Sequence, residues 1–108
     1  MNINKKLREL RIAAGLTQHE LARVSGVPYA TLSQIETYRH QPTMGTVTAL
    51  LAVYGLCVEP PLDELLVEMR EWSREEIGSM RYAKTIKRWE TFCTAVARVG
   101  WTVELVDA

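Results

Sequence analysis

Hydrophobic positions along the chain recur at spacings of three and four residues, and glycines and prolines separate one such run from the next. This spacing is typical of amphipathic helices. Leu7, Leu10 and Ala14 form the apolar stripe of a first helix. Gly15 follows it, and glycine often ends a helix because it adopts the left-handed conformation at little cost. The pattern therefore predicts short helices joined by tight turns.

Capping residues mark the next two helices. Thr17 and Glu20 form a T-x-x-E capping box, in which each side chain satisfies a backbone donor of the new helix. Gly26 breaks this helix. Pro28 opens a third helix at its first position, where its missing N–H is not needed, and that helix ends near Glu36. These two helices are thus short and closely joined.

Two further helices follow at similar intervals. Thr43 caps a fourth helix and Gly55 ends it, while Pro60 and Pro61 begin a fifth. Their apolar sides consist of Val47, Leu50, Leu51, Tyr54, Leu62, Leu65, Leu66 and Met69. Five short helices with small loops predict an all-α bundle.

The last third of the chain predicts one long helix and one strand. Ser73 and Glu76 form another capping box, so a sixth helix begins near Arg74 and ends at Gly100. Its apolar seam, which would pack against another helix, consists of Tyr82, Ile86, Trp89, Cys93 and Val96. The tail W-T-V-E-L-V, residues 101–106, then alternates apolar and polar residues, which indicates a β-strand.

A single strand in a helical chain has no sheet to join, and its N–H and C=O groups need partners. The same strand from a second copy would supply them in an antiparallel ribbon across a two-fold axis. We therefore expect a homodimer. Its interface residues would be Trp89, Trp101, Val103 and Leu105. Core packing within one chain is the alternative for the two tryptophans.

The segment V-P-Y-A-T-L-S-Q-I-E, residues 27–36, has an unusual outward face. Val27 and Leu32 lie on its apolar side, whereas the other side is polar, small and almost uncharged. The solvated face of a helix more often carries many charged residues. Ala22 is small enough for a close helix crossing, and Gly26 permits a tight turn before the segment. The pattern is that of a helix-turn-helix, which projects its second helix outward.

The run L-T-Q-H-E-L-A-R-V-S-G-V-P-Y-A-T-L-S-Q-I-E, residues 16–36, resembles the helix-turn-helix of the phage-repressor (Cro/Xre) family. The likeness extends from Leu7 through Leu66. It implies a five-helix DNA-binding domain, which we expect over residues 1–72, acting as a homodimer on a palindromic operator in double-stranded DNA. Residues 73–108 would then be an extension, a helix and a short strand, that serves dimerisation.

The resemblance also implies which residues contact DNA. The base-reading positions are Tyr29, Ala30, Ser33 and Gln34. The phosphate-binding positions are Gln18, Pro28, Thr31, Tyr38 and Arg39. Lys5 and Arg23 are expected to bind phosphates as well, because they are basic. Glutamine can pair with adenine, serine can donate or accept, and alanine can pack on a thymine methyl group. Gln18 could instead only solvate the start of its helix, and Tyr29 could pack on the surface of its own domain.

Two positions depart from the usual pattern of the family. Tyr38 lies two residues beyond Glu36, where the family often has glycine. Tyr29 occupies a position that is often basic. The first change bears on the path of the loop after the recognition helix, and the second on the base contacts.

Charge is spread unevenly along the 108 residues, although the net charge is zero. Residues 1–42 carry six basic and three acidic side chains, whereas residues 43–72 carry one basic and five acidic. We therefore expect the first part of the chain to meet an anion and the acidic middle not to.

Other chemistries find little support in the sequence. Cys57 and Cys93 are far apart, and His19 and His40 are not at ligand spacing, so we expect no metal ion and no cofactor. There is no Ser/His/Asp or Cys/His set and no phosphate-cradling glycine loop, so we expect no enzyme. The sequence shows no long apolar run and no signal-peptide pattern, which predicts a cytoplasmic protein.

These patterns favour a sequence-specific DNA-binding transcriptional regulator, a homodimeric repressor of its own operon. The ending V-A-R-V-G-W-T-V-E-L-V-D-A is similar to that of the Hip-type antitoxins. The antitoxin of a toxin–antitoxin system is therefore a narrower hypothesis. The alternative is a protein-interaction module whose main partner is another protein, such as a toxin, docked on the acidic stretch 59–71, with DNA binding secondary.

Overall fold

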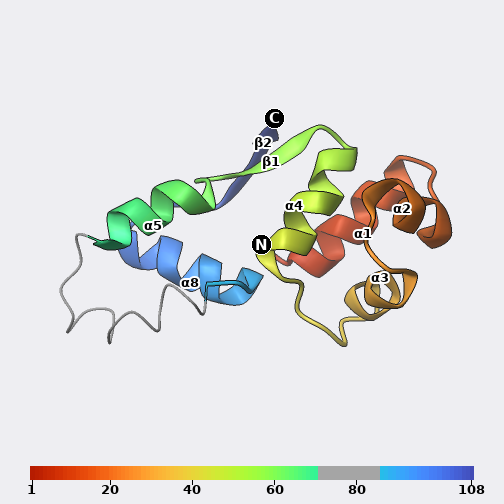
Figure 1. The fold of residues 1–108 in the computed structure, drawn as a ribbon, viewed down its shortest axis with the longest axis horizontal. Coiled ribbons are helices and arrows are strands. Elements are labelled where there is room, and N and C mark those ends of the chain that lie inside the picture. Colours follow the sequence, from red (N-terminus) through yellow and green to blue (C-terminus); the bar gives the residue numbers. More distant parts are fainter. Residues whose placement is uncertain (71–85) are drawn as a thin grey trace.

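The structure, a computed structural model, describes residues 1–70 and 86–108. Within these ranges it contains six helices and two strands (Figure 1). In chain order they are α1 (Ile3–Ala13), α2 (Gln18–Ser25), α3 (Tyr29–Glu36), α4 (Met44–Val53), β1 (Leu56–Glu59), α5 (Leu62–Arg70), α8 (Trp89–Val99) and β2 (Glu104–Asp107). The mostly helical class predicted from the sequence is confirmed.

The helix caps follow the prediction closely. The hydroxyl of Thr17 accepts from the N–H of Glu20 at 3.1 Å, and the Glu20 carboxylate accepts from the N–H of Thr17 at 3.3 Å, so the capping box of α2 is confirmed. Thr43 caps α4 in the same way, by accepting a backbone N–H of its first turn. Pro28 has an extended backbone and precedes α3, one position from the prediction that it opens the helix.

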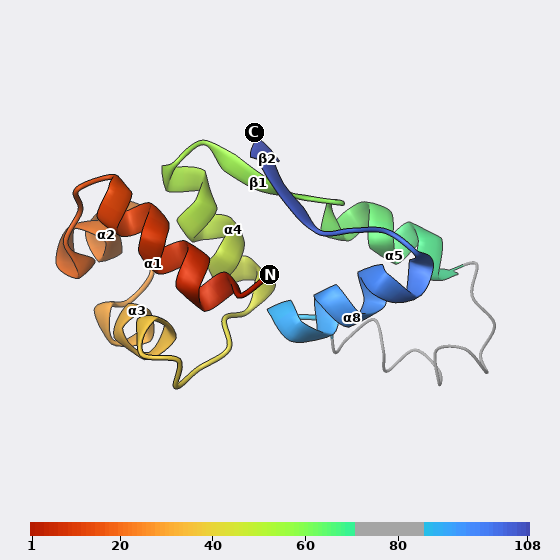
Figure 2. The same ribbon diagram turned by 180° about the vertical axis from the view of Figure 1, so that it is seen from behind.

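The helices form two groups. α1, α2, α3 and α4 lie together at one end of the molecule, and α5 lies beside α8 at the other end (Figures 1 and 2). α4 connects the groups, because it packs against α2 in the first group and against α8 and β1 in the second. α5 packs against α8, so the helix and strand that end the chain are built into the fold.

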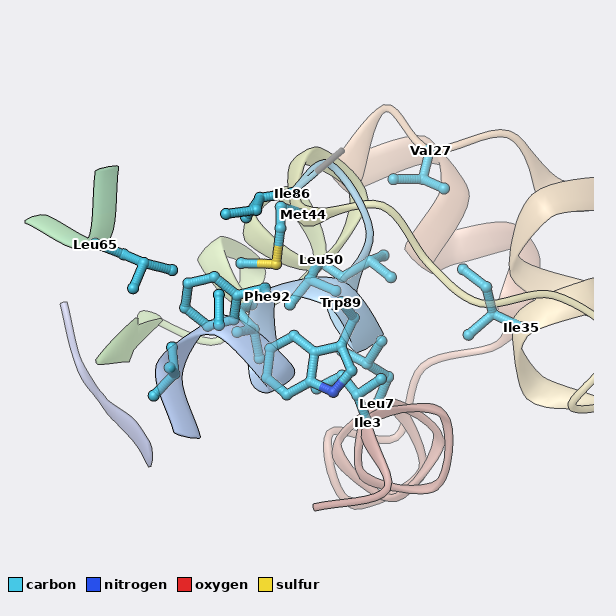
Figure 3. Close-up of a cluster of buried hydrophobic side chains, with 14 of the residues drawn as sticks. Ile3, Leu7, Val27, Ile35, Met44, Leu50, Leu65, Ile86, Trp89 and Phe92 are labelled. Atoms are coloured by element: carbon cyan, nitrogen blue, oxygen red, sulfur yellow. The ribbon is translucent and has the colours of Figure 1, made fainter. Parts of the chain in front are cut away.

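One hydrophobic core runs through both groups. Ile3 and Leu7 of α1 are buried, and Trp89 of α8 packs beside them (Figure 3). Phe92, which is fully buried, lies one turn further along α8 on the side facing Leu65 of α5. Burying a side chain of this size stabilises a fold by about 1.5–3 kcal/mol. α8 is therefore held against the helices on both sides of it.

Backbone hydrogen bonds attach the start of α8 to the loop that follows α3. The N–H of Trp89 donates to the carbonyl of Pro42 at 3.1 Å, and the N–H of Met44 donates to the carbonyl of Lys87. These two bonds form an isolated antiparallel bridge between residues far apart in the sequence. The loop after α3 is thus tied to the last part of the chain.

This bridge interrupts the long sixth helix predicted from the sequence. Arg88 has an extended backbone (φ −97°, ψ 148°), so the helix begins at Trp89. The predicted start near Arg74, and Tyr82 of the predicted seam, lie outside the described residues. The prediction of a continuous helix was wrong just before Trp89. Ile86 and Trp89 are both buried, but from the two sides of a bridge and not along one helix face.

The C-terminal strand finds its partner within the chain. β1 and β2 are antiparallel, with Leu56 opposite Asp107 and Glu59 opposite Glu104. The sequence did not predict β1, and the strand predicted from Trp101 begins three residues later. The premise that this strand has no sheet to join in its own chain was therefore wrong, and it needs no second copy to form a ladder.

A buried ion pair ties α1 to the end of α3. Arg11 donates from Nε and Nη2 to the Glu36 carboxylate at 2.7–3.1 Å, and from Nη1 to the carbonyl of Leu16 at 2.8 Å. Only 5 % of the Glu36 side chain and 15 % of the Arg11 side chain are exposed. The hydrogen bond to Glu36 raises the pKa of Arg11, although burial acts in the opposite direction. A paired, two-point contact of this kind fixes orientation as well as distance.

Asn4 makes a second tie between the same two elements. Its buried amide donates to the carbonyls of Ile35 and His40, both at 2.9 Å. Carbonyls in the last turn of a helix lack partners within the helix. Asn4 adds a hydrogen bond to the Ile35 carbonyl, which also accepts from the N–H of Tyr38, and binds the His40 carbonyl in the loop. α1 therefore holds both the end of α3 and the residues just beyond it.

Tyr38 adopts the backbone conformation that glycine favours. Its φ is 60°, and the N–H groups of Tyr38 and Arg39 donate to the carbonyls of Ile35 and Gln34. This pair of bonds is a Schellman motif, in which the residue after the helix is left-handed. Gly15 occupies the same position after α1, with φ 71°. The loop after α3 therefore keeps the path that glycine usually provides, at the expense of strain at Tyr38.

Removing one partner of the buried Arg11–Glu36 pair should destabilise the protein strongly. Glu36→Ala leaves the Arg11 charge buried without a counter-charge, and we expect it to lower the free energy of unfolding in urea by about 3–5 kcal/mol. Glu9→Ala is the control, because Glu9 pairs with Lys5 at 3.9 Å on the surface. Such exposed pairs contribute about 0.3–0.5 kcal/mol. Similar losses for the two variants would contradict a special role of the Arg11–Glu36 pair.

The strain at Tyr38 should be removable. Tyr38→Gly is expected to raise the free energy of unfolding by about 1 kcal/mol, because a left-handed backbone costs an L-residue about 1–2 kcal/mol and glycine little. Tyr38→Ala deletes the same ring but keeps the strain, so it should bring no gain. Thermal or urea unfolding compares the two variants. An equal effect of both would mean that the ring, and not the backbone, decides.

Candidate nucleic-acid interface

A three-residue connection sets the direction of α3. Gly26 ends α2 with φ 75°, a left-handed conformation that glycine adopts without strain, and donates its N–H to the carbonyl of Ala22 at 3.1 Å. Leu21, Val27 and Leu32, from the two helices and their connection, are all buried in the core. α2 and α3 therefore meet as one unit, at the end of the molecule away from α5 and α8 (Figure 1).

α3 presents two different faces. Leu32, Ile35 and Glu36 are buried against the rest of the domain. The predicted base readers all avoid this buried side. Tyr29, Ala30 and Gln34 are exposed, and Ser33 is half-buried. The structure thus brings these four residues together on the accessible surface of one short helix.

The accessible face of α3 carries no charged side chain. Glu36 is the only charged residue among the eight of this helix, and it is turned inward onto Arg11. An exposed carboxylate at this position would repel the phosphates of a nucleic acid. The inward rotation of Glu36 leaves hydroxyl, amide, phenol and methyl groups as the surface chemistry of α3.

The predicted phosphate-binding residues flank this face in the sequence, and most are accessible. Pro28, Tyr38 and Arg39 are exposed, at the two ends of α3. The Schellman hydrogen bond from Arg39 to the carbonyl of Gln34 fixes the backbone from which the guanidinium extends. Thr31, within α3, is half-buried.

The remaining predicted phosphate contacts lie on α1 and α2. Arg23 is exposed and Gln18, the first residue of α2, is half-buried. Lys5 is exposed on α1, but its ammonium lies 3.9 Å from Glu9, which offsets part of its charge. Arg23 and Arg39 are therefore better placed than Lys5 to attract an anion.

Sequence reasoning missed one residue of this surface. His19, in the first turn of α2, stacks on Tyr29, the first residue of α3, with ring centroids 4.0 Å apart and planes 1° from parallel. This stack places the first turn of α2 beside the first turn of α3. The signal available in the sequence was that positions 19 and 29 both carry an aromatic ring.

The four residues predicted for a dimer interface differ in how deeply they are buried. Trp89 is only 3 % exposed and belongs to the core, so it is not on a surface that a second copy could reach. Core packing, the alternative considered for Trp89, is what the structure shows. Trp101, Val103 and Leu105 are half-buried and pack against the core from its edge.

Sites for other chemistry can be described within residues 1–70 and 86–108. No group of three or more His, Cys, Asp and Glu side chains in these ranges could hold a metal ion. Cys57 and Cys93 are free thiols, and burial raises the pKa of Cys93. None of the helices in the same part of the chain is long and apolar enough to cross a membrane.

Comparison with known proteins finds sequence similarity in the part of the chain that contains α2 and α3. Residues 7–57 match the helix-turn-helix family profile. The chain is 40 % identical over 52 residues to the HTH-type transcriptional regulator PuuR of Escherichia coli (strain K12), and equally to PuuR of Shigella flexneri.

These alignments cover 48 % of this chain and 28 % of each relative, so the chain spans less than a third of the length of these regulators. No solved structure is significantly similar to it. The match includes every residue from α2 to the end of α4, together with the turn at Gly26 that orients α3. Residues 7–57 therefore match the Cro/Xre-type helix-turn-helix family.

Proposed function

We propose that the protein is a sequence-specific DNA-binding transcriptional regulator in which α3 enters the major groove. The observation that carries the proposal is the uncharged outward face of α3, produced by the burial of Glu36 on Arg11. Exposed arginines lie outside α3, at Arg23 and Arg39. Neutral side chains for base contacts, with cations beside them for phosphate contacts, would let one surface serve both roles.

The side chains on α3 suit direct readout of A·T-containing sites. Gln34 can pair through two hydrogen bonds with adenine, and Ala30 can pack against a thymine methyl group. Ser33 can donate or accept a hydrogen bond. α3 has no arginine or lysine, the residues that most often mark guanine.

Affinity in this proposal comes from the residues beside α3. Arg23 and Arg39 bind phosphates, and Gln18 at the start of α2 adds a neutral donor. Such contacts set the register of the protein on the duplex and make binding depend on salt. Lys5 contributes less, because Glu9 competes for its ammonium group.

The proposal extends to a homodimer that represses its own operon. A palindromic operator would require two copies of α3 about 34 Å apart, one turn of DNA. The β1–β2 sheet supports such a pairing, because a two-stranded sheet is only marginally stable by itself and leaves its outer edges open. The two copies would meet through whole sheets, with Trp101, Val103 and Leu105 nearby, and not by exchange of one strand.

A protein partner is the second candidate, and the acidity of the sheet favours it. Glu59 and Glu104 face each other directly across β1 and β2, where like charges are destabilising. Asp63 and Glu64 are also exposed at the start of α5. A basic protein, such as a toxin for which this chain would be the antitoxin, would relieve this repulsion.

Selection of DNA from a random-sequence library tests the first proposal directly. Purified protein should enrich a defined, palindromic sequence, and fluorescence anisotropy should show tight, salt-dependent binding to it and to the DNA upstream of the gene for this protein. Sedimentation of the complex should give two copies per duplex. Failure to enrich any sequence, together with weak binding at low salt, would reject DNA recognition in favour of a protein partner.

Substitutions of Gln34 and Arg39 should weaken DNA binding in different ways. Gln34→Ala is expected to weaken binding to the selected duplex by about 1–3 kcal/mol while leaving random DNA little affected, because it removes a base contact. Arg39→Ala should weaken both duplexes alike and reduce the slope of log affinity against log salt by about one. Anisotropy titrations at several salt concentrations measure both effects.

Asp63→Ala serves as the control for this comparison, because Asp63 is exposed on α5 and lies outside α2 and α3. It should bind both duplexes like the wild-type protein. An equal loss on every sequence for Gln34→Ala would remove Gln34 from the base-reading set. An unchanged salt slope for Arg39→Ala would remove Arg39 from the phosphate-binding set.

A further inference from the structure

The stack of His19 on Tyr29 joins the two helices of the helix-turn-helix at their first turns. The rings are 4.0 Å apart and parallel within 1°, although both residues lie on the surface. Tyr29 is still 43 % exposed. One side of its ring therefore rests on His19, and the rest of the phenol is available to a ligand.

The neighbours of the two rings restrict their backbones. Thr17 and Glu20 close the capping box around the start of α2, so the turn that carries His19 is well defined. Pro28 has φ −57° immediately before Tyr29, and the pyrrolidine ring locks this angle. With both backbones fixed, the orientation of the phenol depends on the side-chain torsions of Tyr29 alone.

An exposed tyrosine normally samples several rotamers, and binding must select one. Immobilising a free side chain at an interface reduces affinity, whereas a side chain already held in its bound orientation avoids that loss. A flat ring placed against the face of another selects one rotamer before any ligand arrives. Parallel stacking of this kind is favourable for aromatic pairs when the rings are offset.

The position of Tyr29 makes its orientation important for DNA recognition. It is the first residue of α3, and the N-terminal residues of a recognition helix are those that contact base edges. Ala30 beside it is too small to restrict the ring. His19 is thus the one residue of α2 in ring contact with the base-reading surface of α3 among the described residues.

We propose that His19 is a positioning residue for sequence readout: its imidazole ring holds the phenol of Tyr29 in the orientation in which it meets the bases. This inference rests on the proposed function, since it assigns a role within DNA recognition by α3. The contribution comes from the flat face of the ring, so another flat ring at position 19 should replace it.

Four variants test this inference on the duplex selected by the wild-type protein and on random DNA. His19→Ala removes the stack and should weaken binding to the selected duplex about two- to tenfold, the range expected for freeing one side chain, with a smaller effect on random DNA. His19→Phe keeps a flat ring without N–H groups and should bind within about twofold of wild type. Tyr29→Ala and the double variant His19→Ala/Tyr29→Ala should bind equally, because His19 acts only through Tyr29.

Val24→Ala provides the matched control on α2, because Val24 is an exposed side chain, 54 % accessible, outside the stack. It should bind like the wild-type protein. Thermal unfolding of all variants should show nearly unchanged midpoints, since His19 and Tyr29 are exposed. A purely structural role of His19 would instead move the unfolding midpoint and would affect both duplexes alike.

Three results would overturn the inference. Wild-type affinity of His19→Ala would show that the stack does not matter. Equal weakness of His19→Phe and His19→Ala would show that the imidazole N–H groups, and not the ring, contact DNA. A further loss from His19→Ala in the Tyr29→Ala background would show that His19 acts independently. If the wild-type protein itself selects no duplex, the proposed function fails and the stack has no role in DNA recognition.

Discussion

The ion pair of Arg11 with Glu36 is the interaction on which the candidate site depends. It fixes the last turn of α3 to α1, and it also removes the only charge of α3 from the surface. The two effects are linked, because a carboxylate can be buried only when a counter-charge and hydrogen bonds accompany it. Without Arg11, Glu36 would turn toward solvent and place a negative charge next to the residues that we assign to base readout.

The end of α3 is held from two sides. Asn4 and Arg11 reach it from α1, while the bridge between the loop residues 42–44 and residues 87–89 ties the following loop to α8. Trp89 then buries its ring beside Ile3 and Leu7 of α1. The C-terminal part of the chain thus supports the orientation of α3 in addition to any role in dimerisation. The functional division at residues 72 and 73 stays a prediction, although the core is shared across it.

Local chemistry made much of the first half predictable. The capping box of Thr17 and Glu20, the cap at Thr43 and the left-handed turn at Gly26 depend on residues only a few positions apart. The outward set on α3 followed from the 3.6-residue period. The sequence therefore predicted which residues of α3 point outward. It did not predict that Glu36 is buried against Arg11, which lies 25 residues away.

The errors share one cause, which is pairing between distant residues. β1 has only four residues, and its partner β2 lies almost fifty residues away, so neither strand predicts the other. The bridge at Arg88 breaks a helix whose apolar spacing looks continuous. The stack of His19 on Tyr29 also depends on how two helices meet. At Tyr38 the local preference of the residue is overridden. Tyrosine disfavours a positive φ, yet Tyr38 adopts the left-handed turn in which the two Schellman hydrogen bonds form.

We propose that the outward face of α3 is the surface that meets DNA. An NMR titration of the ¹⁵N-labelled protein with a duplex that it has selected tests this most directly, because each backbone amide reports on its own surroundings. We expect the largest shifts in residues 17–19, 23, 28–34 and 38–39, with β1, β2 and α5 little changed. Shifts concentrated in β1, β2 and α5 instead would contradict it.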